Sequence, residues 1–135
     1  MPYAIGSLLS LVVAIFARRV GLDRDRAFYP TVTIVVASYY VLFAVIGGST
    51  PVLAAEMLVM AAFVIAAVVG FRARPWLVVM ALAAHGAFDA VHGHVIDNAG
   101  MPPWWPAFCG SYDVGAALWL AWLMRRDSSR PSRSA

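Results

Sequence analysis

The chain has 135 residues, of which 62% are hydrophobic and 13% charged, and its formal net charge is +3. Soluble globular domains are about 45–50% apolar and about 25% charged, so these proportions exclude a soluble protein and require lipid to cover most of the surface. All ten basic residues are arginines in three short clusters between apolar runs. No basic stripe with interleaved aromatic residues is present, so no nucleic-acid partner is expected.

Five apolar runs follow one another along the chain, each close to the ~20 residues that cross a ~30 Å hydrocarbon layer. No basic segment precedes the first run, so we expect it to remain as a span and not to be cleaved as a signal peptide. The predicted spans are residues 2–17, 28–46, 51–71, 75–96 and 106–124. The sequence therefore predicts one all-α domain, a five-helix transmembrane bundle over residues 1–126, with a disordered tail at residues 127–135.

The arginines divide the connecting segments into two kinds. The loop after the first span, the loop after the third span and the C-terminal tail carry all ten, whereas the loops after the second and fourth spans carry none. Five spans place the arginine-bearing segments on one side, and four spans would mix them. By the positive-inside rule that side is cytoplasmic. We therefore expect a multi-pass protein of a bacterial cytoplasmic membrane, with its N-terminus outside and its C-terminus in the cytoplasm.

Besides His94, which is close to the end of its span, five histidine or acidic residues fall inside the predicted spans. At a rise of about 1.5 Å per residue, Glu56, Asp89, His92 and Asp113 share one layer in the outer half of the membrane, and His85 lies just below it. Each such group costs on the order of 2.5–3.5 kcal/mol if it faces lipid, so we expect all five to face one another. The pattern predicts a polar cavity or network lined by the third, fourth and fifth helices and open towards the outside.

The spacing within the fourth span supports this prediction. His85, Asp89 and His92 stand at i, i+4 and i+7, so they share one helix face, whereas His94 points the opposite way. In the fifth span Cys109 and Asp113 stand at i and i+4, again on one face. Cys109 is the single cysteine, so no disulfide within the chain is possible.

Several functions fit these residue types. Histidines with carboxylates suit a divalent metal such as zinc, iron or manganese. The same residues suit acid–base chemistry on a lipid-like or isoprenoid-like molecule that enters from the membrane. A non-enzymatic binding, sensing or transport subunit, a homo-oligomer, a structural network and a subunit of a larger complex stay open as alternatives. The predicted metal ligands are His85, Asp89, His92, Glu56 and Asp113, and the predicted catalytic residues are His85, Asp89, Glu56 and Asp113.

The segment before the fifth span is rich in proline and tryptophan, in the order Pro102-Pro103-Trp104-Trp105-Pro106. Tryptophans are enriched where a membrane protein meets the lipid head groups. The segment therefore predicts an interfacial anchor, with a lid over the polar site as the alternative.

The second half of the chain resembles a known sequence pattern. The run from His85 through Asp89 to His92, followed by Trp104-Trp105-Pro106-Ala107-Phe108-Cys109 and Asp113, resembles a family of short bacterial membrane proteins without assigned activity. The resemblance covers about 45 residues and implies a membrane location. A fainter similarity links the pair His85 and Asp89 to the emopamil-binding-protein group of sterol isomerases, which has Glu where Asp89 stands. That similarity implies a helical bundle with a His–acid pair in a membrane cavity.

Overall fold

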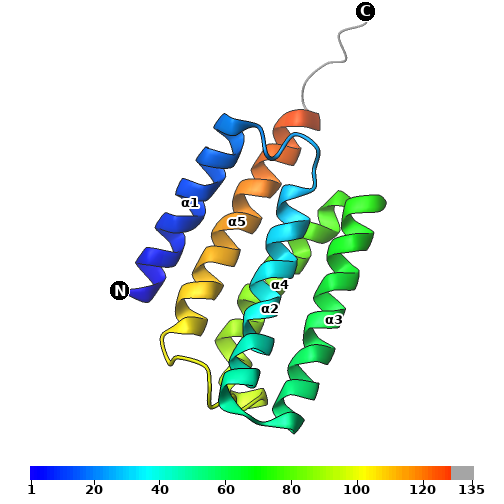
Figure 1. Ribbon diagram of the computed structural model, residues 1–135. Coiled ribbons are helices and arrows are strands. Elements are labelled where there is room, and N and C mark those ends of the chain that lie inside the picture. The colour runs from blue at the N-terminus through cyan, green and yellow to red at the C-terminus, as the bar shows by residue number, and fades with distance from the viewer. Residues whose placement is uncertain (129–135) are drawn as a thin grey trace, which may run out of the picture.

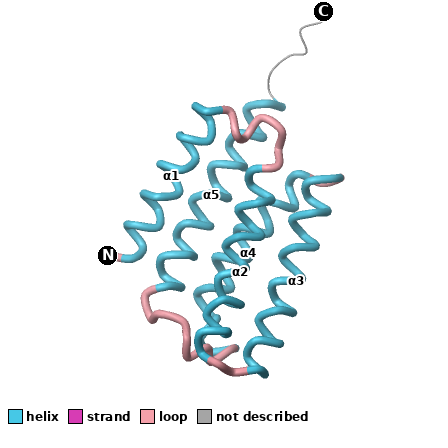
Figure 2. Tube along the Cα trace, viewed as in Figure 1, coloured by secondary structure: helices cyan, strands magenta, loops and turns pink. Residues whose placement is uncertain are grey.

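The computed structural model describes residues 1–128, which form five helices and no strand (Figures 1 and 2). The helices are α1 (Pro2–Val20), α2 (Phe28–Gly47), α3 (Thr50–Arg72), α4 (Pro75–Val95) and α5 (Trp105–Ser128). The predicted all-α architecture is confirmed, and each of the five predicted spans corresponds to one helix. The largest difference is at the end of α5, which continues to Ser128 and so includes the first two residues assigned to the tail. Residues 129–135 lie outside the described residues.

All five helices are long and apolar enough to cross a membrane. Each helix also exposes large apolar side chains, which a soluble protein would bury. Examples in chain order are Leu8, Phe16, Leu42, Val45, Leu58, Ile65, Met80, Val91, Leu118 and Trp122. Both features describe a multi-pass membrane protein whose outer surface is adapted to hydrocarbon.

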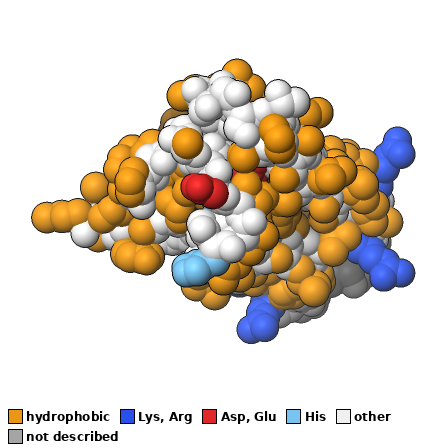
Figure 3. Space-filling view, turned by 90° about the horizontal axis from the view of Figure 1, so that it is seen from below, with side chains coloured by type: hydrophobic (Ala, Val, Ile, Leu, Met, Phe, Trp, Pro, Cys, Tyr) orange, Lys and Arg blue, Asp and Glu red, His pale blue; other side chains and the backbone are white. Residues whose placement is uncertain are grey.

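The connections lie at two opposite ends of the bundle. Residues 21–27, residues 73–74 and the C-terminal end of α5 lie at one end, and residues 48–49 and 96–104 lie at the other (Figure 1). Gly21 and Gly48 end α1 and α2 with φ of 88° and 69°, a left-handed conformation that glycine adopts without strain. Seen from the end that carries residues 96–104, the surface is largely hydrophobic, and arginines appear only towards the margin of the view (Figure 3).

Helix α5 lies between α1 and α4 and packs closely against both. The buried residues of α1 are all small and follow one stripe, which consists of Gly6, Ser10, Ala14 and Ala17. A Cβ on Gly6 would collide with the Phe108 carbonyl and the Ser111 hydroxyl of α5. Small residues let two backbones approach closely, and this contact replaces the hydrophobic effect between helices in lipid.

The α4–α5 contact has the same character but lies beside polar residues. A Cβ on Gly86 would lie 2.9 Å from the Gly110 carbonyl oxygen, and a Cβ on Gly110 would lie 3.2 Å from the Asp89 Cβ. The two glycines therefore bring the Asp89 side chain directly against α5. Towards the arginine-bearing end the interior is apolar instead, with a core cluster of Tyr29, Val78, Leu82, Ala116, Ala117 and Leu123.

Candidate metal centre

The buried face of α4 positions the site. Its buried residues follow the helical repeat as Val78, Ala81, Leu82, His85, Gly86, Asp89 and His92. The predicted shared face of His85, Asp89 and His92 is thus confirmed, and these side chains are at most 2% exposed. His94 is exposed, as the opposite orientation predicts. Glu56 of α3 and Asp113 of α5 are also buried, at 1% and 0% exposure.

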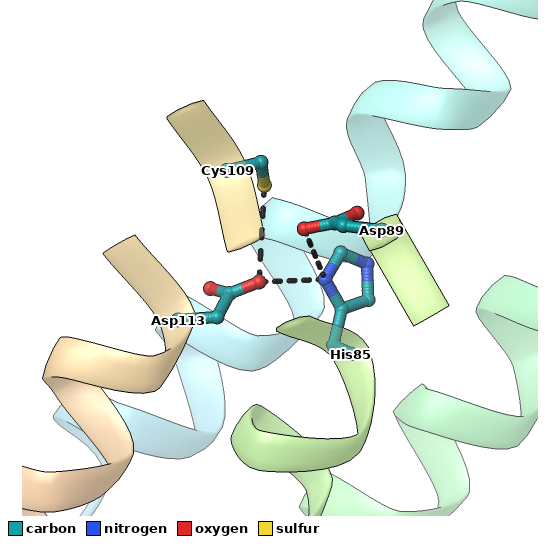
Figure 4. A group of neighbouring side chains, drawn as sticks. All are labelled: His85, Asp89, Cys109 and Asp113. Carbon is teal, nitrogen blue, oxygen red and sulfur yellow. Dashed lines mark hydrogen bonds and ion pairs between the residues drawn. The ribbon is translucent and has the colours of Figure 1, made fainter. Parts of the chain in front are cut away.

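Four of the buried side chains form a compact group, which we call the central cluster: His85, Asp89, Cys109 and Asp113 (Figure 4). One potential ligand atom from each lies within 4.8 Å of the others. His85 Nδ1 is hydrogen-bonded to Asp113 Oδ2 at 2.6 Å and lies 3.7 Å from Asp89 Oδ2. The Cys109 thiol donates to Asp113 Oδ2 at 3.8 Å. One nitrogen, one sulfur and two carboxylates therefore converge between α4 and α5.

A second group, the loop-side cluster, consists of Glu56, His92 and Asn98. Glu56 Oε1 lies 2.8 Å from His92 Nε2 and accepts a hydrogen bond of 2.9 Å from the Asn98 amide. These three residues come from α3, from α4 and from the loop of residues 96–104. The loop-side cluster therefore connects three segments at the end of the bundle that carries no arginine loop.

Tyr40 of α2 lies between the two clusters. Its hydroxyl donates to Asp89 Oδ1 at 2.5 Å, and its ring stacks on His92 with 4.0 Å between centroids. The Asn98 amide also donates to the Tyr40 carbonyl oxygen at 3.0 Å. Tyr40 thus holds the Asp89 carboxylate of the central cluster with its hydroxyl and supports the loop-side cluster with its ring and backbone.

The five predicted site residues therefore converge from α3, α4 and α5, but they separate into two groups. His85, Asp89 and Asp113 lie in the central cluster, and Glu56 and His92 lie outside it. The reason is distance along α4: seven residues from His85 to His92 correspond to about 10 Å of helix rise. His85 therefore contacts Asp113 and His92 contacts Glu56, and the four ligand atoms within 4.8 Å of one another include none from His92.

The expected opening towards the outside is not present among the described residues, because all five side chains are nearly inaccessible. The central cluster instead borders two surface grooves, one through Asp89 and a smaller one of about 290 Å³ through Cys109. The groove that Asp89 lines, which we call the α5 groove, lies between α1, α4 and α5, and its volume is about 950 Å³. Access to the central cluster is therefore from the lipid-facing side of the bundle.

Sequence reasoning had not assigned three of these residues to the site. For Cys109 the signal was present, because its i, i+4 spacing to Asp113 puts both on one face. Tyr40 was one of two adjacent tyrosines at a suitable depth, and the sequence did not distinguish it from Tyr39. Asn98 has no periodicity to indicate its direction, because it lies in a loop that packs back onto α2 through Gly100.

The Pro–Trp segment separates into two parts. Trp105 begins α5 and packs its ring against Tyr39 and Phe43 of α2 at centroid distances of 4.8 and 5.0 Å. Trp104 is about half exposed beside it. Trp105 therefore fixes the start of α5 against α2, a few residues before Cys109.

Comparison of the chain with known proteins found no matching family model, no matching curated protein and no matching solved structure.

Proposed function

We propose that this protein binds one divalent metal ion, zinc in the first place, at the central cluster and uses it on a lipid-like molecule from the membrane. The observation that carries the proposal is the convergence of four buried ligand atoms within 4.8 Å. A histidine, a cysteine and two aspartates provide nitrogen, sulfur and oxygen donors together, and zinc accepts all three kinds. Iron is the next candidate, whereas manganese favours an all-oxygen set.

The distances in the central cluster support a tetrahedral ion. Ligand atoms about 2.0–2.3 Å from a tetrahedral centre are about 3.3–3.8 Å from one another. The separations from Asp89 Oδ2 to His85 Nδ1 and from Cys109 Sγ to Asp113 Oδ2, at 3.7 and 3.8 Å, already have this value. The 2.6 Å contact between His85 and Asp113 has to widen, and any separation near the 4.8 Å limit of the group has to shorten by about 1 Å.

The charges of the central cluster also support a cation. Asp89 and Asp113 bring up to two negative charges into the bundle interior, and His85 brings at most one positive charge. Unpaired charge inside a bundle is costly. The partners of the two carboxylates are His85, Tyr40 and Cys109, and His85 is the one of these that can carry a positive charge. A divalent ion offsets both carboxylates at once.

A second candidate function is metal-free acid–base chemistry on the same lipid-like molecule. The 2.6 Å hydrogen bond between His85 and Asp113 favours it, because a carboxylate that orients an imidazole is a recurrent arrangement in proton transfer. In that case His85, Asp89 and Asp113 handle the proton, and Glu56 acts only through the neighbouring cluster. A binding, sensing or transport subunit uses the same residues without turnover, which an assay on lipid extracts separates from an enzyme.

The arginine distribution supports an orientation for this site. Eight arginines of the described residues lie at one end of the bundle, in the order Arg18, Arg19, Arg24, Arg26, Arg72, Arg74, Arg125 and Arg126. The positive-inside rule makes that end cytoplasmic, which leaves the N-terminus and the loop of residues 96–104 outside. The central cluster then lies in the outer half of a bacterial cytoplasmic membrane.

The test is the metal content of the detergent-purified protein after zinc loading and removal of excess ion. We expect about one zinc per chain in the wild type and none in His85→Ala or Asp89→Asn. His94→Ala and Asp97→Asn are matched controls, because they remove the same groups from exposed positions on the same side of the bundle. Loss of zinc in the controls, or no zinc in any sample, contradicts a metal at the central cluster; the second result favours the metal-free alternative.

A further inference from the structure

The α5 groove runs along the bundle from the Pro–Trp segment towards the arginine-bearing end. Its lining residues include Ser7 and Leu11 of α1, Ala90 of α4, and Leu118 and Trp122 of α5. From Gly110, which contacts Asp89, to Trp122 the helix rises by about 18 Å. This exceeds the ~15 Å of one hydrocarbon leaflet, which is half of a ~30 Å layer. The groove is therefore long enough for an extended hydrocarbon chain.

The groove contains one carboxylate among its described lining residues, and that carboxylate is Asp89. Its side chain is 2% exposed, and its Oδ2 is buried, lies 3.7 Å from His85 Nδ1 and has no partner within hydrogen-bond distance. The hydroxyls of Ser10 and Ser111, in contrast, donate to the carbonyls of Ser7 and Phe108 in their own helices. A buried acceptor without a donor is costly, so Asp89 Oδ2 marks the point at which a polar group of a bound molecule is best accommodated.

We infer that the α5 groove binds the hydrocarbon chain of a long-chain alcohol, with its hydroxyl at Asp89 and its tail directed towards Trp122. A hydroxyl is the smallest head group that can donate to the Asp89 carboxylate from the groove. Larger charged head groups do not fit the apolar surroundings, where Gly86, Gly110 and Val114 line the same groove as Asp89. The inference rests on the proposed function for its chemical purpose and adds the substrate class.

Small residues form the part of the groove nearest Asp89. Ala90, Ala107 and Gly110 are among its lining residues, and Ala90 is exposed into it. A bulky side chain at Ala90 therefore obstructs the head-group end of the groove without replacing any residue of the central cluster. Ala87, one turn earlier on α4, is also exposed but does not line the groove, so the same substitution there is a matched control.

The experiment uses photolabelling of the full chain in phosphatidylcholine nanodiscs. The probe is hexadecanol with a diazirine on its terminal carbon, and peptide mass spectrometry locates the label with and without excess unlabelled hexadecanol. We expect competable labelling on α5 around Leu118 to Trp122, reduced at least about tenfold in Ala90→Trp, which corresponds to a modest loss of binding free energy. Ala87→Trp keeps the labelling. A geranylgeraniol competitor distinguishes an isoprenoid alcohol from a saturated one.

A second variant keeps the test decisive if Ala90→Trp does not fold. Leu118→Trp narrows the part of the groove nearer the arginine-bearing end. It should therefore weaken competition by hexadecanol and leave competition by the shorter decanol unchanged. Labelling that is not competed, or that is equal in Ala90→Trp and Ala87→Trp, reports general contact with lipid and overturns the inference. Conversion of a dimer to a monomer by Ala90→Trp alone assigns the groove to a second copy of the chain and also overturns it.

The proposed metal centre and the proposed binding of a long-chain alcohol can be contradicted independently of each other. His85→Ala removes a metal ligand but no residue of the groove, so this variant should lose zinc and keep competable labelling. Labelling without zinc in the wild type retains the groove inference and rejects the metal. Zinc without competable labelling retains the metal centre and rejects the long-chain alcohol.

Discussion

The central cluster and the loop-side cluster are built from similar residues and differ in the number of carboxylates per imidazole. The loop-side cluster pairs one carboxylate, Glu56, with one imidazole, His92, and adds an amide from Asn98. The central cluster gathers two carboxylates and a thiol around one imidazole and borders the α5 groove through Asp89. Both clusters bury ionisable groups, so burial alone does not distinguish them. Under the proposed function, the pair of Glu56 and His92 stabilises the fold by connecting several segments, and the central cluster forms the binding centre.

The largest effect on stability is expected for His92→Ala, and it separates a stabilising role from a metal-binding role. His92→Ala leaves Glu56 as an unpaired buried charge, which typically costs about 3–5 kcal/mol. We expect a strongly lowered thermal unfolding temperature in detergent, with zinc still bound by the part of the population that remains folded. The double variant Glu56→Leu with His92→Leu removes both charges and should recover much of the loss. Wild-type stability together with loss of zinc in His92→Ala would place His92 among the metal ligands and remove the distinction.

Asn98→Ala should have a smaller effect on the same cluster. The substitution removes the amide that donates to both Glu56 and the Tyr40 carbonyl, and hydrogen bonds to neutral and charged acceptors contribute about 0.5–3 kcal/mol. We expect a moderate loss of stability and faster hydrogen exchange in the loop of residues 96–104. Asp97→Ala, at an exposed neighbouring position, is the control. Unchanged exchange in Asn98→Ala would show that Asn98 does not hold the loop.

Tyr40→Phe should affect stability least and metal binding most specifically. The phenylalanine ring keeps the stacking on His92 but loses the hydroxyl that donates to Asp89. Groups that orient a metal ligand typically contribute 10–100-fold, so we expect about this loss in zinc affinity in competition with a chelator. Tyr39→Phe is the matched control, since Tyr39 contacts Trp105 and lies outside both clusters. Equal affinities in the two variants would mean that Tyr40 does not position Asp89.

Much of the fold followed from the sequence because the membrane imposes simple rules. Span length, prolines such as Pro51 and Pro75 at helix starts, and the arginine clusters each act locally along the chain. The buried face of α4 was predictable for the same reason, because His85, Asp89 and His92 follow the helical period. The periodicity of one helix says which residues share a face and how far apart they lie in depth.

The division into two clusters did not follow from the sequence, although part of it was available. The ~10 Å rise between His85 and His92 already places the two imidazoles at different depths in the bundle. The pairing of His85 with Asp113 and of His92 with Glu56 depends on how α3 and α5 are placed against α4, and close contacts such as Gly86 with Gly110 decide that placement. The direction of Asn98 depends on a loop, where no repeat applies.

The most direct test of the account is X-ray absorption spectroscopy at the zinc edge on the zinc-loaded protein, wild type beside Cys109→Ser. The central cluster predicts one sulfur neighbour at about 2.3 Å together with nitrogen and oxygen neighbours at about 2.0–2.2 Å. The sulfur signal should disappear in Cys109→Ser, because Cys109 is the single cysteine of the chain. A wild-type spectrum with nitrogen and oxygen neighbours only, or a protein that retains no zinc, would contradict a metal centre built from His85, Asp89, Cys109 and Asp113.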